Sequence, residues 1–104
     1  MNNQWRFKGN ELKYLKDVID SGEGSGTLGS YNNAFENLYA KTTNAKYAVT
    51  FNSGTSTLHA ALDALGVGYG DEVIIPPLTV YSNFAVTIAA NAIPVFADVE
   101  RDTF

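Results

Sequence analysis

Two stretches in the first half of the chain place apolar residues at the spacing of a helix. The first follows Asn10, which suits an N-cap, has Glu11 in its first turn and stops at Ser21-Gly22. The second begins at Ser30, which can cap it. The apolar positions are Leu12, Leu15, Val18 and Ile19 in the first stretch, and Tyr31, Ala34, Phe35 and Leu38 in the second. Both patterns predict amphipathic helices.

The second half alternates short β-rich runs with helical patterns. Strands are expected at Tyr47–Phe51, Glu72–Ile75 and Pro94–Ala97, and helices at Thr55–Leu65 and Tyr81–Ala90. The residues expected to face inward are Leu58, Ala61, Leu62 and Leu65 on the first of these helices and Phe84, Ala85 and Ile88 on the second. This alternation predicts an α/β fold with parallel strands, right-handed crossovers and helices packed on the sheet.

The carboxyl ends of parallel strands share one edge of a sheet, and ligands bind outside that edge. Here the strand ends are Asn52–Ser56, Pro76–Ser82 and Asp98–Arg101. We therefore expect the Ser-Gly-Thr-Ser turn and the segment 79–83 to share a pocket.

Composition excludes several classes of protein. The chain has 104 residues, 45% of them apolar and 17% charged, which predicts a globular domain or part of one with a real core. A formal net charge of −4 and the lack of a basic run argue against nucleic-acid binding. Without cysteine, no disulfide or cysteine-based metal site exists. The N-terminus does not resemble a signal peptide and the apolar runs are short, so we expect a cytoplasmic enzyme or enzyme fragment with no membrane partner.

The segment Ser53-Gly54-Thr55-Ser56 lies between a predicted strand and a predicted helix. The first N–H groups of a helix have no partner within it, so they can bind an anion, and the two hydroxyls can donate to phosphate oxygens. Gly54 allows close approach and can adopt a positive φ. An ordinary Ser or Thr cap explains the pattern equally well. The segment is neither a Walker A loop nor a G-x-G-x-x-G motif.

Other candidate residues are weaker. Tyr81 could stack on a planar ligand, although the pattern alone favours a core position. His59 could bond Asp63 one turn on, and a catalytic role is the minority interpretation. Asp98 fits a strand-end turn better than a ligand. The glycine-rich segment 21–29 is expected to be a mobile lid or linker, with Thr27 as its most site-like side chain.

Three blocks in order resemble a known family. They are Asn52-Ser-Gly-Thr-Ser-Thr-Leu-His-Ala-Ala-Leu62, Gly68-Tyr-Gly-Asp-Glu-Val-Ile-Ile-Pro-Pro-Leu-Thr79 and Ala92-Ile-Pro-Val-Phe-Ala-Asp-Val99. They look like the N-terminal part of DegT/StrS nucleotide-sugar aminotransferases, which are pyridoxal-phosphate (PLP) enzymes of fold type I. Upstream, Ser21-Gly22, Phe35-Glu36, Ala40 and Ala45–Val49 also fit, so the resemblance covers about residues 10–104.

The resemblance implies a three-layer α/β/α large domain with mainly parallel strands, of which residues 30–104 would form part, after an N-terminal helix and loop at 1–29. It implies amino transfer from glutamate or glutamine to a nucleotide-linked keto-sugar, in a homodimer or larger self-assembly. The PLP phosphate would contact Gly54, Thr55 and Ser56. Thr27 would help to shape the sugar site.

Two departures from the family stand out. The residue after Thr79, which would stack on the pyridine ring, is usually aromatic, and here it is Val80 followed by Tyr81. The family also needs a lysine that forms a Schiff base with PLP and an acidic partner for the ring nitrogen, both expected downstream. The lysines present, none of which fits that motif, are Lys8, Lys13, Lys16, Lys41 and Lys46. The chain is therefore expected to be an N-terminal fragment, inactive alone and without its catalytic residue.

Two alternatives stay open. A sugar dehydratase or a carbon–sulfur lyase of fold type I shares this general layout. A non-catalytic phosphate-binding or subunit-interaction module would need no lysine, and its exposed sheet edges would favour self-association.

Overall fold

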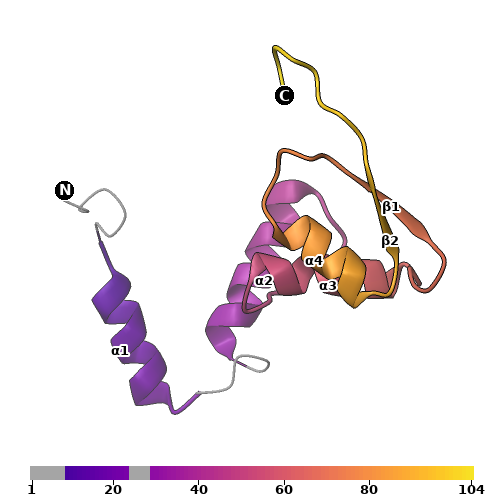
Figure 1. Cartoon of the computed structure of the whole chain (residues 1–104). Helices are drawn as coiled ribbons and strands as arrows, with labels where there is room; N and C mark the ends of the chain where they lie inside the picture. The colour runs from indigo at the N-terminus through magenta and orange to yellow at the C-terminus, as the bar shows by residue number, and fades with distance from the viewer. Residues whose placement is uncertain (1–8, 24–28) are drawn as a thin grey trace. The chain divides into compact units, whose positions relative to one another are not determined.

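The computed structural model describes residues 9–23 and 29–104. The chain divides into two compact units, Met1–Thr50 and Phe51–Phe104. The first contains helices α1 and α2, and the second contains α3, β1, α4 and β2 in that order (Figure 1). The expected domain boundary after residue 29 concerns a longer protein and stays a prediction.

Both helices of the first unit form where the apolar pattern predicts them. α1 spans Glu11–Ser21 and α2 spans Ser30–Thr43. Gly22 ends α1 in the left-handed conformation, at φ +68°, which glycine adopts without steric cost.

The N-cap residue expected for α1 is confirmed in position, and the one expected for α2 is wrong. Asn10 occupies the N-cap position of α1, but its side chain makes no capping hydrogen bond. Gly29, not Ser30, is the N-cap residue of α2. The Glu23 carboxylate instead accepts a hydrogen bond from the Ser30 N–H at 2.8 Å, which satisfies one of the unpaired donors of that helix end.

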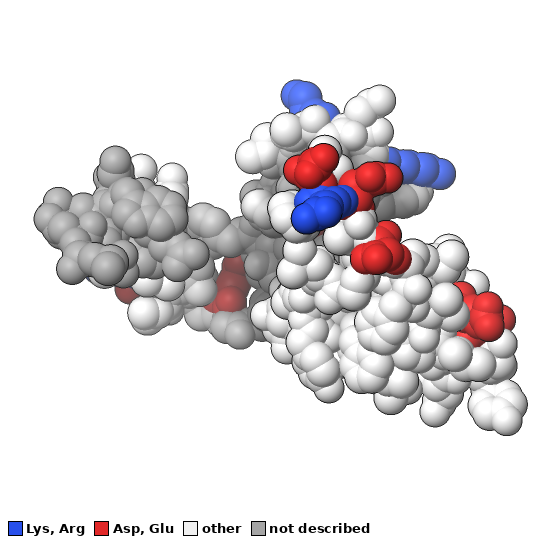
Figure 2. Space-filling model, turned by 45° about the horizontal axis from the view of Figure 1, so that its top comes forward, with Lys and Arg blue, Asp and Glu red and all other residues white. Residues whose placement is uncertain are grey.

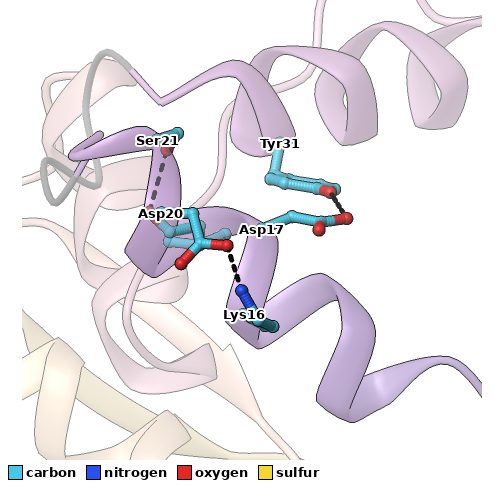
Figure 3. Close-up of polar contacts among 6 residues, drawn as sticks. Lys16, Asp17, Asp20, Ser21 and Tyr31 are labelled. Atoms are coloured by element: carbon cyan, nitrogen blue, oxygen red, sulfur yellow. Dashed lines mark hydrogen bonds and ion pairs between the residues drawn. The ribbon is translucent and has the colours of Figure 1, made fainter.

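Polar contacts hold α1 and link it to α2 (Figure 3). Lys16 pairs with Asp20 one turn along α1, and the Ser21 hydroxyl donates to the Val18 carbonyl at 2.8 Å. The Tyr31 hydroxyl of α2 donates to Asp17 of α1 at 3.2 Å (Figure 3). Partial removal from water and the adjacent Asp17 carboxylate raise the pKa of Tyr31 above its usual 10.0.

A second link joins α2 to the end of the first unit. The Glu36 carboxylate accepts hydrogen bonds from both the N–H and the hydroxyl of Thr50, at 2.7 and 2.8 Å. These two bonds, the backbone one first, lower the pKa of Glu36 from its usual 4.5, because they stabilise the ionised form.

The second unit is a parallel strand pair with a helix in its crossover. α3 spans Gly54–Ala64, β1 Glu72–Ile75, α4 Ser82–Ala89 and β2 Ile93–Phe96. β1 pairs with β2 in parallel, from Glu72 opposite Ile93 to Ile75 opposite Phe96. α4 contacts both strands and α3 packs on α4 (Figure 1). The α/β class and the parallel pairing are thus confirmed, with element ends shifted by one residue or less from those expected.

The strand expected at Tyr47–Phe51 is absent, so that prediction is wrong. Among the described residues, β1 and β2 pair only with each other, and Tyr47–Phe51 joins no ladder. Strand-forming residues become a strand only when another strand supplies hydrogen-bond partners. This segment has the composition of a strand without such a partner.

The core is smaller than composition predicts. In the described part of the chain, the buried apolar side chains are Ile75, Val86 and Ala92, joined by the buried Thr87. Thr87 donates to the Asn83 carbonyl at 2.8 Å, which satisfies its hydroxyl. Ile88, expected to face inward, is 49% exposed, and the buried residues of α4 are Val86 and Thr87 instead. On α3 and at its C-cap, Leu58, Ala61 and Leu65 are exposed as well, so the inward positions expected for them are wrong.

Acidification should break the Glu36–Thr50 link at a pH below 4.5. The carboxylate accepts both bonds, so the folded chain keeps Glu36 ionised to lower pH than the unfolded chain does. The stabilisation is therefore full above the ordinary pKa and is lost as the pH falls through the lowered one. We expect the amide NMR resonance of Thr50 to titrate with a midpoint below 4.5.

Two variants control this experiment. Glu36→Gln should abolish the transition, because an amide does not titrate. Thr50→Val keeps the N–H bond but loses the hydroxyl, so its midpoint should move back toward 4.5. A midpoint at or above 4.5 in the unaltered chain would contradict the interpretation.

Candidate anion site at the start of helix α3

Ser53 caps α3. Its hydroxyl accepts a hydrogen bond from the Ser56 N–H at 3.1 Å and lies 3.0 Å from the Ser56 hydroxyl. Its carbonyl accepts from the Thr57 N–H and hydroxyl, at 3.1 and 3.2 Å. The capping interpretation of the Ser-Gly-Thr-Ser turn is therefore confirmed for Ser53.

The Ser53 cap does not satisfy every backbone N–H donor at the start of α3. Within the described part of the chain, the N–H groups of Gly54 and Thr55 meet no acceptor, and both belong to the first turn of α3. A Cβ added at Gly54 would find nothing within 4 Å, so space is open in front of this turn. Gly54 does not use the positive φ that glycine allows, because it is helical; among the described glycines the positive-φ ones are Gly22, Gly66 and Gly70. Its contribution is space, since it lacks a side chain.

The segment 79–83 lies next to the Ser-Gly-Thr-Ser turn, as the sequence predicts. The Thr55 hydroxyl lies 2.7 Å from the hydroxyl of Ser82, the first residue of α4, which forms a hydrogen bond between two helix N-termini. Asn83 donates through its side-chain amide to the Thr79 hydroxyl at 2.9 Å, which fixes the turn into α4. The expected proximity is confirmed. A shared pocket is not, because the hollow of about 240 Å³ between α3, β1 and α4 includes Asn83 but none of residues 53–56.

Val80 and Tyr81 lie in the turn before α4. Val80 is 63% exposed and Tyr81 75% exposed, so the core position favoured for Tyr81 is wrong. The Tyr81 ring contacts Phe84 at a centroid distance of 5.8 Å, and Phe84 stacks on Phe96 of β2 at 6.3 Å. Tyr81 therefore belongs to an aromatic row that runs back to the strand pair.

The charge around the start of α3 is unusual for a phosphate-binding site. Residues 51–104 contain one basic residue, Arg101, against six acidic ones, and residues 73–97 carry no charged side chain. A broad uncharged area occupies much of the face shown in Figure 2. Attraction for an anion at this site would thus come from helix N-termini, N–H groups and hydroxyls.

Of the remaining described candidates, His59 lies beside a hollow that Ser56 also lines, and Asp98 forms a turn. His59 and Asp63 line a hollow of about 330 Å³ together with Phe51, Ala60 and Ser56 of the turn, and no hydrogen bond joins their two side chains. Asp98 accepts from the Val99 N–H at 2.9 Å, as a turn residue does. Thr27 lies outside the described residues. In the described ranges, no cluster of three or more metal-ligating side chains exists, and no helix is long and apolar enough to cross a membrane.

The sequence analysis did not predict the hydrogen bond between the Ser82 and Thr55 hydroxyls. It placed segment 79–83 near the turn but did not single out this hydroxyl. A serine at the first position of a helix that follows a strand end would have been the available signal.

A family model decides where the chain belongs. The model of the DegT/DnrJ/EryC1/StrS aminotransferase family matches residues 6–104. The chain belongs to this family. The resemblance stated from the sequence is confirmed.

Individual relatives agree. The chain is 43% identical over 95 residues to GDP-perosamine synthase from Vibrio cholerae, covering 91% of this chain and 26% of that protein. An aminotransferase from Psychrobacter cryohalolentis matches with a TM-score of 0.85 at 34% identity, over 90% of this chain and 24% of the other. The PLP form of the putative sugar aminotransferase Spr1654 from Streptococcus pneumoniae matches with a TM-score of 0.75 at 34% identity, over 86% and 23%.

One structural neighbour carries the name of a different reaction. GDP-4-keto-6-deoxymannose-3-dehydratase, solved with a trapped PLP-glutamate geminal diamine, matches with a TM-score of 0.76 at 27% identity, over 86% of this chain and 24% of that one. Across these comparisons the chain spans about a quarter of the length of the proteins that it matches.

Replacing the cap should destabilise α3. Ser53→Ala removes the acceptor for the Ser56 N–H, and we expect a loss of about 1 kcal/mol in the free energy of unfolding. Urea denaturation followed by circular dichroism measures this loss. Ser53→Asn keeps a good capping oxygen and should lose much less. Equal stability of Ser53→Ala and the unaltered chain would show that the cap contributes nothing.

Proposed function

We propose that this chain is the N-terminal part of a PLP-dependent aminotransferase that acts on a nucleotide-linked keto-sugar, with glutamate or glutamine as amino donor. The family match over residues 6–104 supports the class of enzyme. The 43% identity to a GDP-perosamine synthase supports a nucleotide-sugar substrate. The fold-type-I neighbours, one of them in a PLP form, support the cofactor.

The single observation that carries the proposal is the unfilled donor set at the start of α3. Gly54 and Thr55 offer two N–H groups with no acceptor among the described residues, and the space before Gly54 is open. An acceptor-only group of several oxygens, such as a phosphate, fits these donors. The residues present thus fit PLP at its phosphate end.

The proposed division of labour follows from the elements. PLP supplies an electron sink for chemistry at the amino-acid carbon. Gly54, Thr55 and Ser56 would bind and orient its phosphate, and these three residues are called the phosphate seat. Val80 or Tyr81, exposed in the turn before α4, would lie against the ring. The contacts of Tyr81 with Phe84 favour Val80 for that position, because they hold the Tyr81 ring toward β2. Thr27 is kept as a proposed sugar-site residue and a homodimer as the proposed assembly.

A dehydratase is the second candidate function. It is favoured by the likeness to GDP-4-keto-6-deoxymannose-3-dehydratase. Both proposed functions would place the PLP phosphate at the start of α3. In enzymes of fold type I, a histidine at the position of the lysine that forms the Schiff base with PLP would indicate a dehydratase.

A methyl group at Gly54 tests the seat. Gly54→Ala should leave the stability of α3 unchanged or raise it by up to about 1 kcal/mol, since alanine favours helix. The same methyl group enters the space proposed for the phosphate, so the dissociation constant for PLP should rise about tenfold or more. Gly68→Ala is the matched control, because its Cβ would meet only an ordinary contact at 3.9 Å. Unchanged PLP affinity in Gly54→Ala would refute the proposed seat.

The lysines of this chain should not bind PLP as a catalytic lysine does. The unit that holds the seat, residues 51–104, contains no lysine. After borohydride reduction with PLP, mass spectrometry should find no stoichiometric adduct on Lys8, Lys13, Lys16, Lys41 or Lys46. A single fully modified lysine would overturn the proposal that the catalytic lysine lies elsewhere.

A further inference from the structure

The hydroxyl pair Thr55–Ser82 joins two helix ends that are far apart in sequence. Thr55 is the second residue of α3 and Ser82 the first residue of α4, and their oxygens are 2.7 Å apart. Packing of α4 on α3 and on both strands holds these ends together, and the buried Val86 and Thr87 anchor α4. The contact therefore rests on the fold of the second unit.

The donors and acceptors of this pair can be counted. Each hydroxyl has one O–H donor and two acceptor lone pairs. The shared hydrogen bond uses one of the two O–H groups. Neither side chain has a second partner among the described residues, so one O–H donor remains beside the free N–H groups of Gly54 and Thr55.

An anion would select one direction for this pair. A phosphate only accepts hydrogen bonds, so the remaining O–H must point at it. With Ser82 donating to Thr55, the Thr55 hydroxyl is free to donate to the anion, and each bond of such a chain strengthens the next. Without Ser82, the Thr55 hydroxyl can rotate to another acceptor, for example a carbonyl of the preceding turn.

We infer that Ser82 is a positioning residue of the phosphate seat: its hydroxyl orients that of Thr55, so that Thr55 donates to the phosphate. This inference rests on the proposed function, because it assumes that a phosphate binds at the start of α3. Among the described residues the Ser82 hydroxyl bonds only Thr55, so its removal is expected to act on the phosphate end of the ligand.

The experiment compares PLP with pyridoxal, which has the same ring and no phosphate. Dissociation constants of the purified chain for PLP, pyridoxal and inorganic phosphate are measured by amide NMR titration, with the Gly54 and Thr55 resonances as reporters. The variants are Ser82→Ala, Ser82→Thr, Thr55→Val and the double variant. Ser30→Ala is the matched control, because Ser30 holds the same first position in α2.

The expected result is a loss that depends on the phosphate. Ser82→Ala should weaken PLP and inorganic phosphate about fivefold, the size of one hydrogen bond, and leave pyridoxal unchanged. Ser82→Thr keeps the hydroxyl and should restore binding. Because the two hydroxyls act in series, the double variant should bind no worse than Thr55→Val alone. Unchanged resonances of β1 and β2 will show that the variants are folded.

Different failures are distinguishable. If the unaltered chain prefers PLP to pyridoxal and Ser82→Ala keeps that preference, or if the two losses simply add, the inference about Ser82 is wrong while the seat stands. If the unaltered chain shows no preference for PLP and no response to inorganic phosphate, the proposed seat is wrong, and the inference falls with it. Equal weakening of PLP and pyridoxal would assign Ser82 a purely structural role and would overturn the inference as well.

Discussion

Parallel pairing of β1 with β2 is the constraint from which the geometry of the site follows. Two adjacent parallel strands need a crossover, and here the crossover contains α4. The chain leaves β1 at Ile75 and starts α4 at Ser82, beyond the carboxyl edge of the pair. α3 packs on α4 with its own start at Gly54, so both helix N-termini face one another through Thr55 and Ser82. The pairing of a few backbone groups thereby positions side chains 27 residues apart.

Local signals in the sequence were enough for most of the second unit. β1 was predicted with its observed ends, and α3, α4 and β2 within a residue, because caps, glycines and apolar periodicity are read from neighbouring residues. The strand predicted at Tyr47–Phe51 was wrong because its formation is not decided by neighbouring residues. Its strand propensity is local, but a strand exists only through a partner elsewhere in the chain. The predictions that Ile88 and Tyr81 are buried were wrong for a similar reason, because the exposure of a side chain depends on which other elements pack around its helix.

The candidate site shows the same division. The Ser53 cap could be predicted from four residues, and so could the likeness to a phosphate-binding turn. The bond between Thr55 and Ser82 could not, because it depends on the register of α4 against α3. Many large apolar side chains are exposed in both units, among them Leu12 and Ile19 of α1 and Ile74 of β1. Apolar surface of this extent is typical of interfaces, and the proteins that the chain matches are about four times as long.

The scarcity of basic residues in the second unit has a consequence for how an anion would respond to salt. Six acidic side chains and one arginine give residues 51–104 a repulsive long-range field for phosphate. The attraction at the start of α3 acts over contact distances, through hydrogen bonds and through a helix-end charge that falls off within the first turn. Added salt, with a Debye length of about 10 Å at 0.1 M, would weaken the repulsion more than the attraction. A phosphate group would therefore bind this turn no less tightly at moderate ionic strength than at low, which is the reverse of what a lysine-rich or arginine-rich phosphate site does.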